Sequence, residues 1–224
     1  MNELIFFTHI ALMAFLLLFA LKKGKECLIA FVCLCSISAN FFILKQIELF
    51  SLSVTSSDVY AIGAVFGLNL LQEFFDKKEA KKAVYISFFT LLAFLIFTQF
   101  HLKYLPSQAD QTDASFARLL HLSPRIILSS LLVFYLSQRI DLFLFGLLKK
   151  AFREKWLGLR MLFSQTAAQL LDTLLFSFLA LWGEVENLFH IIVLSFSIKC
   201  LIILLSSPFS LLAKRFQAKE ATNG

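Results

Sequence analysis

Charged residues are scarce in this chain of 224 residues, because Asp, Glu, Lys and Arg together make up only 16% of it. A soluble domain usually carries about 25% charged and about 45–50% apolar residues. Here 59% of the residues are hydrophobic and Phe alone occurs 28 times, more than one soluble core of this length needs. The shortage of charge therefore excludes an ordinary soluble domain and predicts an integral membrane protein.

Cysteine is sparse too, and its placement argues against a metal or redox site. The four thiols lie in or beside apolar runs, at Cys27, Cys33, Cys35 and Cys200. The spacing of Cys33 and Cys35 is neither a zinc nor a redox spacing, and no histidine lies nearby to complete a site. We expect buried thiols, no metal site and no cofactor.

The patterns that indicate an enzyme or an ATPase are missing. Neither a Gly-x-x-x-x-Gly-Lys nucleotide loop nor a His-Glu-x-x-His zinc motif occurs. Asp141 and Asp172 could pair as in an intramembrane aspartyl hydrolase, but no glycine flanks either of them. We therefore expect no enzyme, and any use of ATP would come from a partner protein.

Seven apolar runs approach or exceed the roughly 20 residues that cross a hydrocarbon core. They cover residues 4–21, 27–44, 57–75, 83–102, 124–147, 162–183 and 188–212. The first has no basic residue ahead of it and no cleavage pattern after it, so it should remain as a membrane helix. The sequence predicts an all-α, polytopic membrane bundle of seven transmembrane helices, with one transmembrane domain over residues 1–213 and a tail over residues 214–224.

The basic residues indicate how this bundle is oriented. Fifteen of the 21 Lys and Arg residues follow the first, third, fifth and seventh runs, which puts them on one side of the bilayer. Because positive loops stay inside, the N-terminus should be outside and the tail cytoplasmic. The loop at residues 103–123 should then be external. The net charge of +6 reflects this orientation, and we expect no nucleic-acid partner.

Two of the predicted helical runs share the sequence motif Gln-x-x-Asp-x-x-x-Phe. It occurs as Gln138, Asp141 and Phe145, and again as Gln169, Asp172 and Phe176. The three side chains fall along one helical face, and a carboxylate within a bilayer usually faces a partner, a cavity or a pathway. An amide, a carboxylate and a ring suit a planar, guanine-like base, whose N–H donors a carboxylate accepts and whose faces stack on aromatic rings.

Further polar residues interrupt the apolar runs and complete the candidate substrate site. They are Asn40, Asn69, Gln72, Glu73, Arg125 and Gln165. Structural roles remain open for several charged residues. Arg125 lies near the end of a run, where it can snorkel to the interface. Asp141 could pair with Arg139, and Lys199 could pair with either aspartate. The pair Gly63 and Gly67, four residues apart, predicts close helix packing within the chain.

At these residues the chain resembles the bacterial queuosine-precursor transporter family. The resemblance runs from about residue 36 to residue 182. It rests on Ser38-Ala39-Asn40 with Lys45, the segment Asn69-Leu70-Leu71-Gln72-Glu73-Phe74-Phe75, Arg125, Ser137-Gln138, Asp141, Arg160, Ser164-Gln165, Gln169, Asp172-Thr173 and Phe176. Two features depart from the family, because Asn69 stands where Asp is frequent and the first run is additional to a six-helix core.

The resemblance implies a carrier in the bacterial cytoplasmic membrane. Its cargo would be a 7-deazaguanine base, which is a 7-deazapurine used for tRNA modification. Queuine and its biosynthetic precursors are such bases. The alternative is a substrate-binding membrane subunit of a multi-component vitamin importer. The sequence leaves open a homodimer or an energising partner protein.

Overall fold

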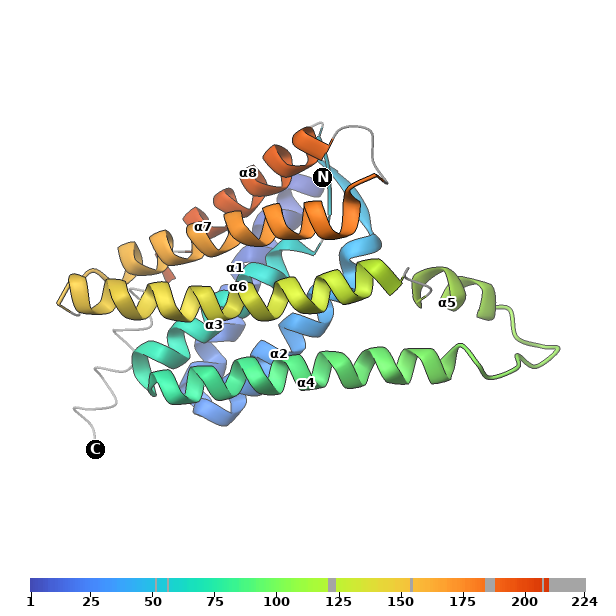
Figure 1. Cartoon of the computed structure of the whole chain (residues 1–224), viewed down its shortest axis with the longest axis horizontal. Helices are drawn as coiled ribbons and strands as arrows, with labels where there is room; N and C mark the ends of the chain where they lie inside the picture. Colours follow the sequence, from blue (N-terminus) through green and yellow to red (C-terminus); the bar gives the residue numbers. More distant parts are fainter. Residues whose placement is uncertain are drawn as a thin grey trace.

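The computed structural model describes residues 1–50, 52–55, 57–120, 124–153, 155–183, 188–206 and 208–209. Long helices dominate this part of the chain (Figure 1). They are α1 (Asn2–Lys23), α2 (Lys25–Phe41), α3 (Asp58–Phe74), α4 (Lys77–His101), α5 (Asp113–Leu120), α6 (Pro124–Ala151), α7 (Leu157–Phe176) and α8 (Leu188–Ser206). A 3₁₀ turn (Phe42–Leu44) extends α2, and a π-helix (Ser177–Leu181) extends α7. The predicted tail at residues 214–224 lies outside the described residues.

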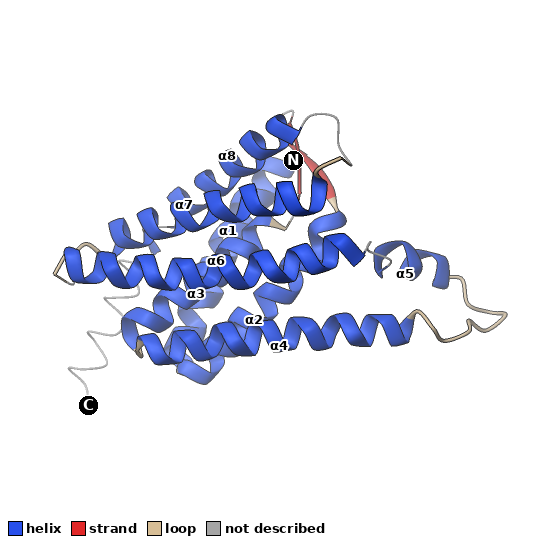
Figure 2. Ribbon diagram, in the orientation of Figure 1, coloured by secondary structure: helices blue, strands red, loops and turns tan. Residues whose placement is uncertain are grey.

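The all-α prediction is confirmed, with one small addition. Strands β1 (Gln46–Leu49) and β2 (Leu52–Thr55) form an antiparallel hairpin between the second and third predicted runs, where no strand was predicted (Figure 2). Gln46 pairs with Thr55 and Leu49 pairs with Leu52. Apolar and polar residues alternate along both strands, which is the period of a half-buried strand. The short helix α5 was not predicted either, and it lies within the loop at residues 103–123.

The outer surface of the bundle is apolar in a way that suits lipid. On α1, Phe15 is 62% exposed, and on α4, Phe89 and Phe97 are 61% and 69% exposed. Large exposed apolar patches of this kind mark a membrane or protein interface. Three described helical segments are long and apolar enough to cross a bilayer, at residues 2–23, 77–101 and 128–151. The chain therefore has the surface of a membrane protein, and the seven-span topology stays a prediction.

The first helix is part of the core. Phe6, Ile10 and Leu17 of α1 are almost fully buried. They pack in the same core cluster as residues of α2, α3 and α8. The helix predicted to be additional to a six-helix core thus packs into the bundle and does not stand apart from it.

Helix α3 runs through the centre of the bundle, and its two glycines allow close packing. A Cβ atom built on Gly67 would lie 2.5 Å from Cγ2 of Val32 on α2 and 3.1 Å from Cδ2 of Leu17 on α1. A Cβ on Gly63 would lie 3.0 Å from the side chain of Met13. The predicted small-residue pair therefore serves packing within the chain.

Gly67→Ala should destabilise the bundle by about 1–3 kcal/mol, because the new methyl group overlaps a short, β-branched side chain that cannot swing away. Gly63→Ala is the matched control, since the flexible Met13 side chain can move aside and the loss should be smaller. Thermal unfolding of the purified protein in detergent measures both. Equal melting temperatures for Gly67→Ala and the unsubstituted protein would contradict this packing.

The helix connections sort the bundle into two ends. The α1–α2 and α3–α4 turns lie toward the lower left in Figure 1, as does the turn after α6. The hairpin, α5 and the start of α8 lie toward the opposite end. The turns of the first group carry several basic residues, such as Lys23, Lys78 and Lys150.

Candidate functional site

Polar side chains from α3, α6 and α7 meet inside the bundle. We call this group the polar cluster and define it as Asn69, Gln72, Glu73, Gln138, Asp141, Arg160, Ser164, Gln165 and Gln169. Asn69, Asp141, Arg160 and Ser164 are 0% exposed, and the four glutamines are at most 4% exposed. Spacings of three or four residues put the members from each helix on one face, which explains how three helices aim them at one another.

A hydrogen bond joins α6 to α7 at the middle of this cluster. The hydroxyl of Ser164 donates to Oδ1 of Asp141 at 2.7 Å. The side chain of Asn69 on α3 lies next to the same carboxylate. Asp141 is therefore the residue at which the three helices converge. The alternative Arg139–Asp141 ion pair does not form, because Arg139 is exposed and lies over the ring of Tyr135.

An ion pair joins α3 to α7 at the edge of the cluster near the α3–α4 turn. The guanidinium of Arg160 donates to both carboxylate oxygens of Glu73, at 2.8 and 3.1 Å, and also lies 5.2 Å from the ring centroid of Phe145. Lys149 approaches Glu73 at 3.3 Å. Glu73 thus has a structural partner, and Arg160, which carries part of the family resemblance but was not among the predicted site residues, belongs to the cluster. Its position within the apolar segment Leu157–Phe163 is the feature of the sequence that could have predicted its burial.

Many polar atoms of the cluster have no hydrogen-bond partner among the described residues. They are Asn69 Nδ2 and Oδ1, Gln72 Oε1, Gln138 Oε1, Asp141 Oδ2, Gln165 Nε2 and Gln169 Oε1. Buried polar atoms are nearly always paired in folded proteins, and a lost partner costs about 1–3 kcal/mol. So many unpartnered polar atoms on three facing helices are expected where a polar ligand supplies the missing hydrogen-bond partners.

The second copy of the Gln-x-x-Asp motif has a different environment from the first. Asp172 Oδ2 accepts a 2.7 Å hydrogen bond from Nζ of Lys199 on α8, and Lys199 also donates to Oγ1 of Thr173 at 3.2 Å. Gln169 joins the polar cluster, whereas Asp172 forms the structural ion pair with Lys199 that the sequence left open. The two motifs therefore do not present equivalent carboxylates to one site.

Two predicted site residues lie away from the polar cluster or beyond description. Asn40 on α2 donates to the backbone oxygen of Ser36 at 3.0 Å and accepts a hydrogen bond from Ser130 on α6. It ties α2 to α6 and is only partly buried. Arg125 begins the first turn of α6, and its side chain is outside the described part of the structure.

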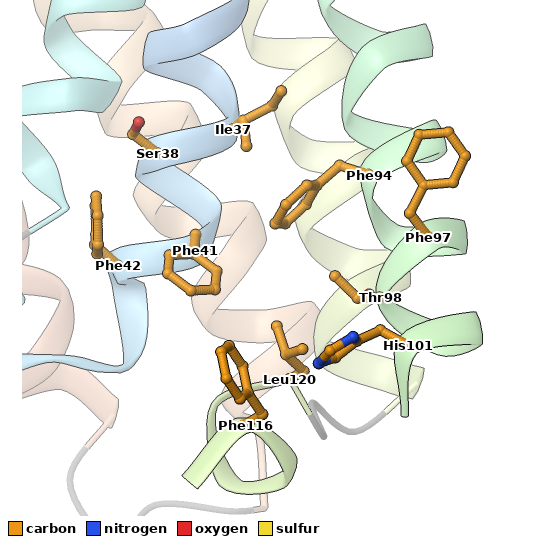
Figure 3. Close-up of a pocket in the computed structure, with 10 residues that line it drawn as sticks. All are labelled: Ile37, Ser38, Phe41, Phe42, Phe94, Phe97, Thr98, His101, Phe116 and Leu120. Atoms are coloured by element: carbon orange, nitrogen blue, oxygen red, sulfur yellow. The ribbon is translucent and has the colours of Figure 1, made fainter. Parts of the chain in front are cut away.

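An aromatic pocket of about 390 Å³ lies between α2, α4 and α5 (Figure 3). It is lined by Ile37, Ser38, Phe41, Phe42, Phe94, Phe97, Thr98, His101, Phe116 and Leu120. None of the predicted site residues lines it, and its few polar groups are partly occupied, since Thr98 donates to the backbone oxygen of Leu95 at 2.7 Å. The pocket provides rings but few hydrogen-bonding groups, so the polar cluster is the better candidate site.

Comparison with known proteins shows where the chain belongs. Residues 56–213, more than two thirds of the chain, match a family model described as "Putative vitamin uptake transporter". The chain belongs to this family. The matched region of the vitamin uptake transporter family includes α3, α6 and α7, and hence the whole polar cluster. It follows that the protein is a membrane transporter and not an enzyme.

A relative from Bacillus subtilis (strain 168) carries the name "Probable queuosine precursor transporter". It is 31% identical over 202 residues, which cover 89% of this chain and 88% of the relative. This alignment takes in most of the chain, in contrast to the family match that begins after the hairpin. No solved structure matches the chain.

Proposed function

We propose that the protein imports a queuosine precursor, a 7-deazaguanine base, across the bacterial cytoplasmic membrane. The observation that carries this proposal is the set of unpartnered, buried polar atoms in the polar cluster. The name of the Bacillus subtilis relative supports the same class of cargo. A base released on the cytoplasmic side would then be available for tRNA modification.

The chemistry of the cluster suits such a base. Five of its unpartnered atoms are oxygens of amide or carboxylate groups, on Asn69, Gln72, Gln138, Asp141 and Gln169. A guanine-type edge offers a ring N–H and an exocyclic amine, and a carboxylate accepts such donors strongly. The carbonyl oxygen of the base requires a donor, which the Nε2 atom of Gln165 can provide. An apolar cargo would leave all of these atoms unpaired.

The candidate binding residues differ in how directly they contact the base in this proposal. Asp141, Gln138, Gln165 and Gln169 contact the base, and Asn69 and Gln72 close the site from α3. Glu73 positions α3 against α7 through Arg160. Asn40 lies outside this group of contacts and links α2 to α6 through Ser130.

The proposed topology has seven spans, an outside N-terminus and a cytoplasmic C-terminus. Gln108→Cys should therefore react with an impermeant thiol reagent in intact cells, because Gln108 is exposed in the loop between α4 and α5. The unsubstituted chain is the control, since its exposed Cys27 lies at the other end of the bundle and should react only after permeabilisation. Labelling of Gln108→Cys only after permeabilisation would contradict this orientation.

Uptake of radiolabelled queuine and its biosynthetic precursors tests the function directly. Cells without a carrier of their own should accumulate the label only when they produce this protein. Sealed vesicles containing the purified chain then distinguish a self-sufficient carrier, which we propose, from a subunit that needs an ATP-hydrolysing partner. Absence of uptake for every 7-deazaguanine offered to cells would refute the proposal.

A further inference from the structure

A second group of charged residues lies apart from the polar cluster, where α3 begins and where α7 and α8 pack together. Lys199 on α8 is bonded directly to Asp172 on α7, at 2.7 Å. Lys199 also interacts electrostatically with Asp58, the first residue of α3. We call Asp58, Asp172 and Lys199 the charge triad.

The triad contains one positive and two negative groups. Asp58 is 6% exposed and Lys199 is 7% exposed, and Oδ2 of Asp58 has no hydrogen-bond partner among the described residues. If all three groups were ionised, the buried site would carry a net charge of −1. An uncompensated charge inside a membrane protein is costly, and one bound proton removes it.

Asp58 is the group that holds this proton. Asp172 has a charged partner in Lys199, at 2.7 Å, and its side chain is also 24% exposed. Asp58 is more deeply buried than Asp172, and its Oδ2 atom accepts no hydrogen bond from the ammonium group of Lys199.

Among the described residues at this end, none of the other titratable groups supplies the missing charge. The rings of His9 on α1 and Tyr60 on α3 pack against each other with centroids 4.7 Å apart. Lys45 is exposed, and β2 contributes no titratable side chain. The side chains of Arg125 and His190 are outside the described part of the structure.

We propose that the charge triad is a proton-binding site, in which Asp58 takes up one proton from external water and later releases it to the cytoplasm, and that this proton flow drives inward transport. The inference rests on the proposed import function. Ionisation of Asp58 attracts Lys199 and weakens its hold on Asp172. Helix α7 carries Asp172 about one turn, or about 4.5 Å, from Gln169 of the polar cluster, so protonation changes how the substrate-facing helix is held.

Infrared spectroscopy of the purified protein tests the proton site without any substrate. The unsubstituted protein should show a carboxylic-acid C=O band that shifts in D₂O, disappears at alkaline pH and is missing from Asp58→Asn. The band should persist in Glu48→Gln, which alters an exposed carboxylate of the nearby hairpin. Absence of the Asp58-dependent band would overturn the proposal. If Asp58→Asn does not fold, Asp58→Glu takes its place, because it keeps a carboxyl group at this position and should shift the frequency of the band, whereas Asp141→Asn should leave the band unchanged.

Transport into proteoliposomes tests the coupling. Acid outside should raise the initial uptake of labelled queuine severalfold in the unsubstituted protein and in Glu48→Gln. Asp58→Asn should lose this response and keep gradient-independent counterflow exchange, because Asn mimics the protonated carboxyl group. Uptake that requires sodium, or an Asp58→Asn protein that still responds to the pH gradient, would overturn the inference. Absence of counterflow in the unsubstituted protein would instead refute the import function, while the infrared result still decides whether Asp58 binds a proton.

Discussion

Asp141→Asn should strongly reduce import at low substrate concentration while the protein still inserts and folds. The substitution is nearly isosteric, and the new amide oxygen can still accept the 2.7 Å hydrogen bond from Ser164. What is lost is the second acceptor, Oδ2, which has no partner among the described residues and is assigned to the base, together with the carboxylate charge that the N–H donors of a bound base would stabilise. A hydrogen bond to a charged group contributes about 1.5–3 kcal/mol, so the affinity for a 7-deazaguanine should fall by about 10- to 150-fold.

Initial uptake rates at increasing substrate concentration measure this loss. Arg139→Gln is the matched control, because Arg139 lies two residues away on α6 but is exposed over Tyr135. It should transport like the unsubstituted protein. An Asp141→Asn protein with unchanged apparent affinity would remove Asp141 from the binding site.

Glu73→Ala should cost about 3–5 kcal/mol of stability, because it removes two hydrogen bonds from a guanidinium that is completely buried. Most of this cost is the penalty for leaving the Arg160 charge without its carboxylate. A loss of this size is a large part of the stability of a membrane protein of this length, so little folded protein should survive extraction in detergent. Thermal unfolding and the yield of monodisperse protein measure the effect.

Two further variants separate charge burial from general damage. Glu79→Ala breaks the Lys25–Glu79 pair, whose side chains are 40% and 20% exposed, and it should cost less than about 1 kcal/mol. Combining Glu73→Gln with Arg160→Met should restore part of the stability, because the fully buried guanidinium is removed together with its carboxylate, and the Lys149 ammonium group that also loses this partner is 26% exposed. A double variant as unstable as Glu73→Ala would contradict the assigned role of this ion pair.

The helices and the presence of a polar site could be predicted from the sequence, since both follow from local composition. Apolar runs of about 20 residues predict helices in lipid, and polar residues within them must find partners inside the bundle. The hairpin was missed although Gln46–Leu49 and Leu52–Thr55 alternate with the period of a strand. Four residues per strand are too few for this alternation to be distinguished from a connection between two long apolar runs.

Which helix would supply each partner could not be predicted. The two Gln-x-x-Asp motifs are alike in sequence, yet one aspartate meets Ser164 and the other meets Lys199. That difference depends on how α6, α7 and α8 are arranged in space, which the spacing within one helix does not encode. The same holds for Arg160, which pairs with a residue 87 positions earlier in the chain.

Equilibrium binding of radiolabelled queuine and its precursors to the purified protein tests most directly whether the polar cluster holds a donor-rich, flat base. We expect saturable binding of at least one of these compounds. Asp141→Asn should weaken this binding tenfold or more, and an analogue without the exocyclic amine should inhibit it poorly. No saturable binding, or binding that neither Asp141→Asn nor loss of that amine weakens, would contradict this expectation.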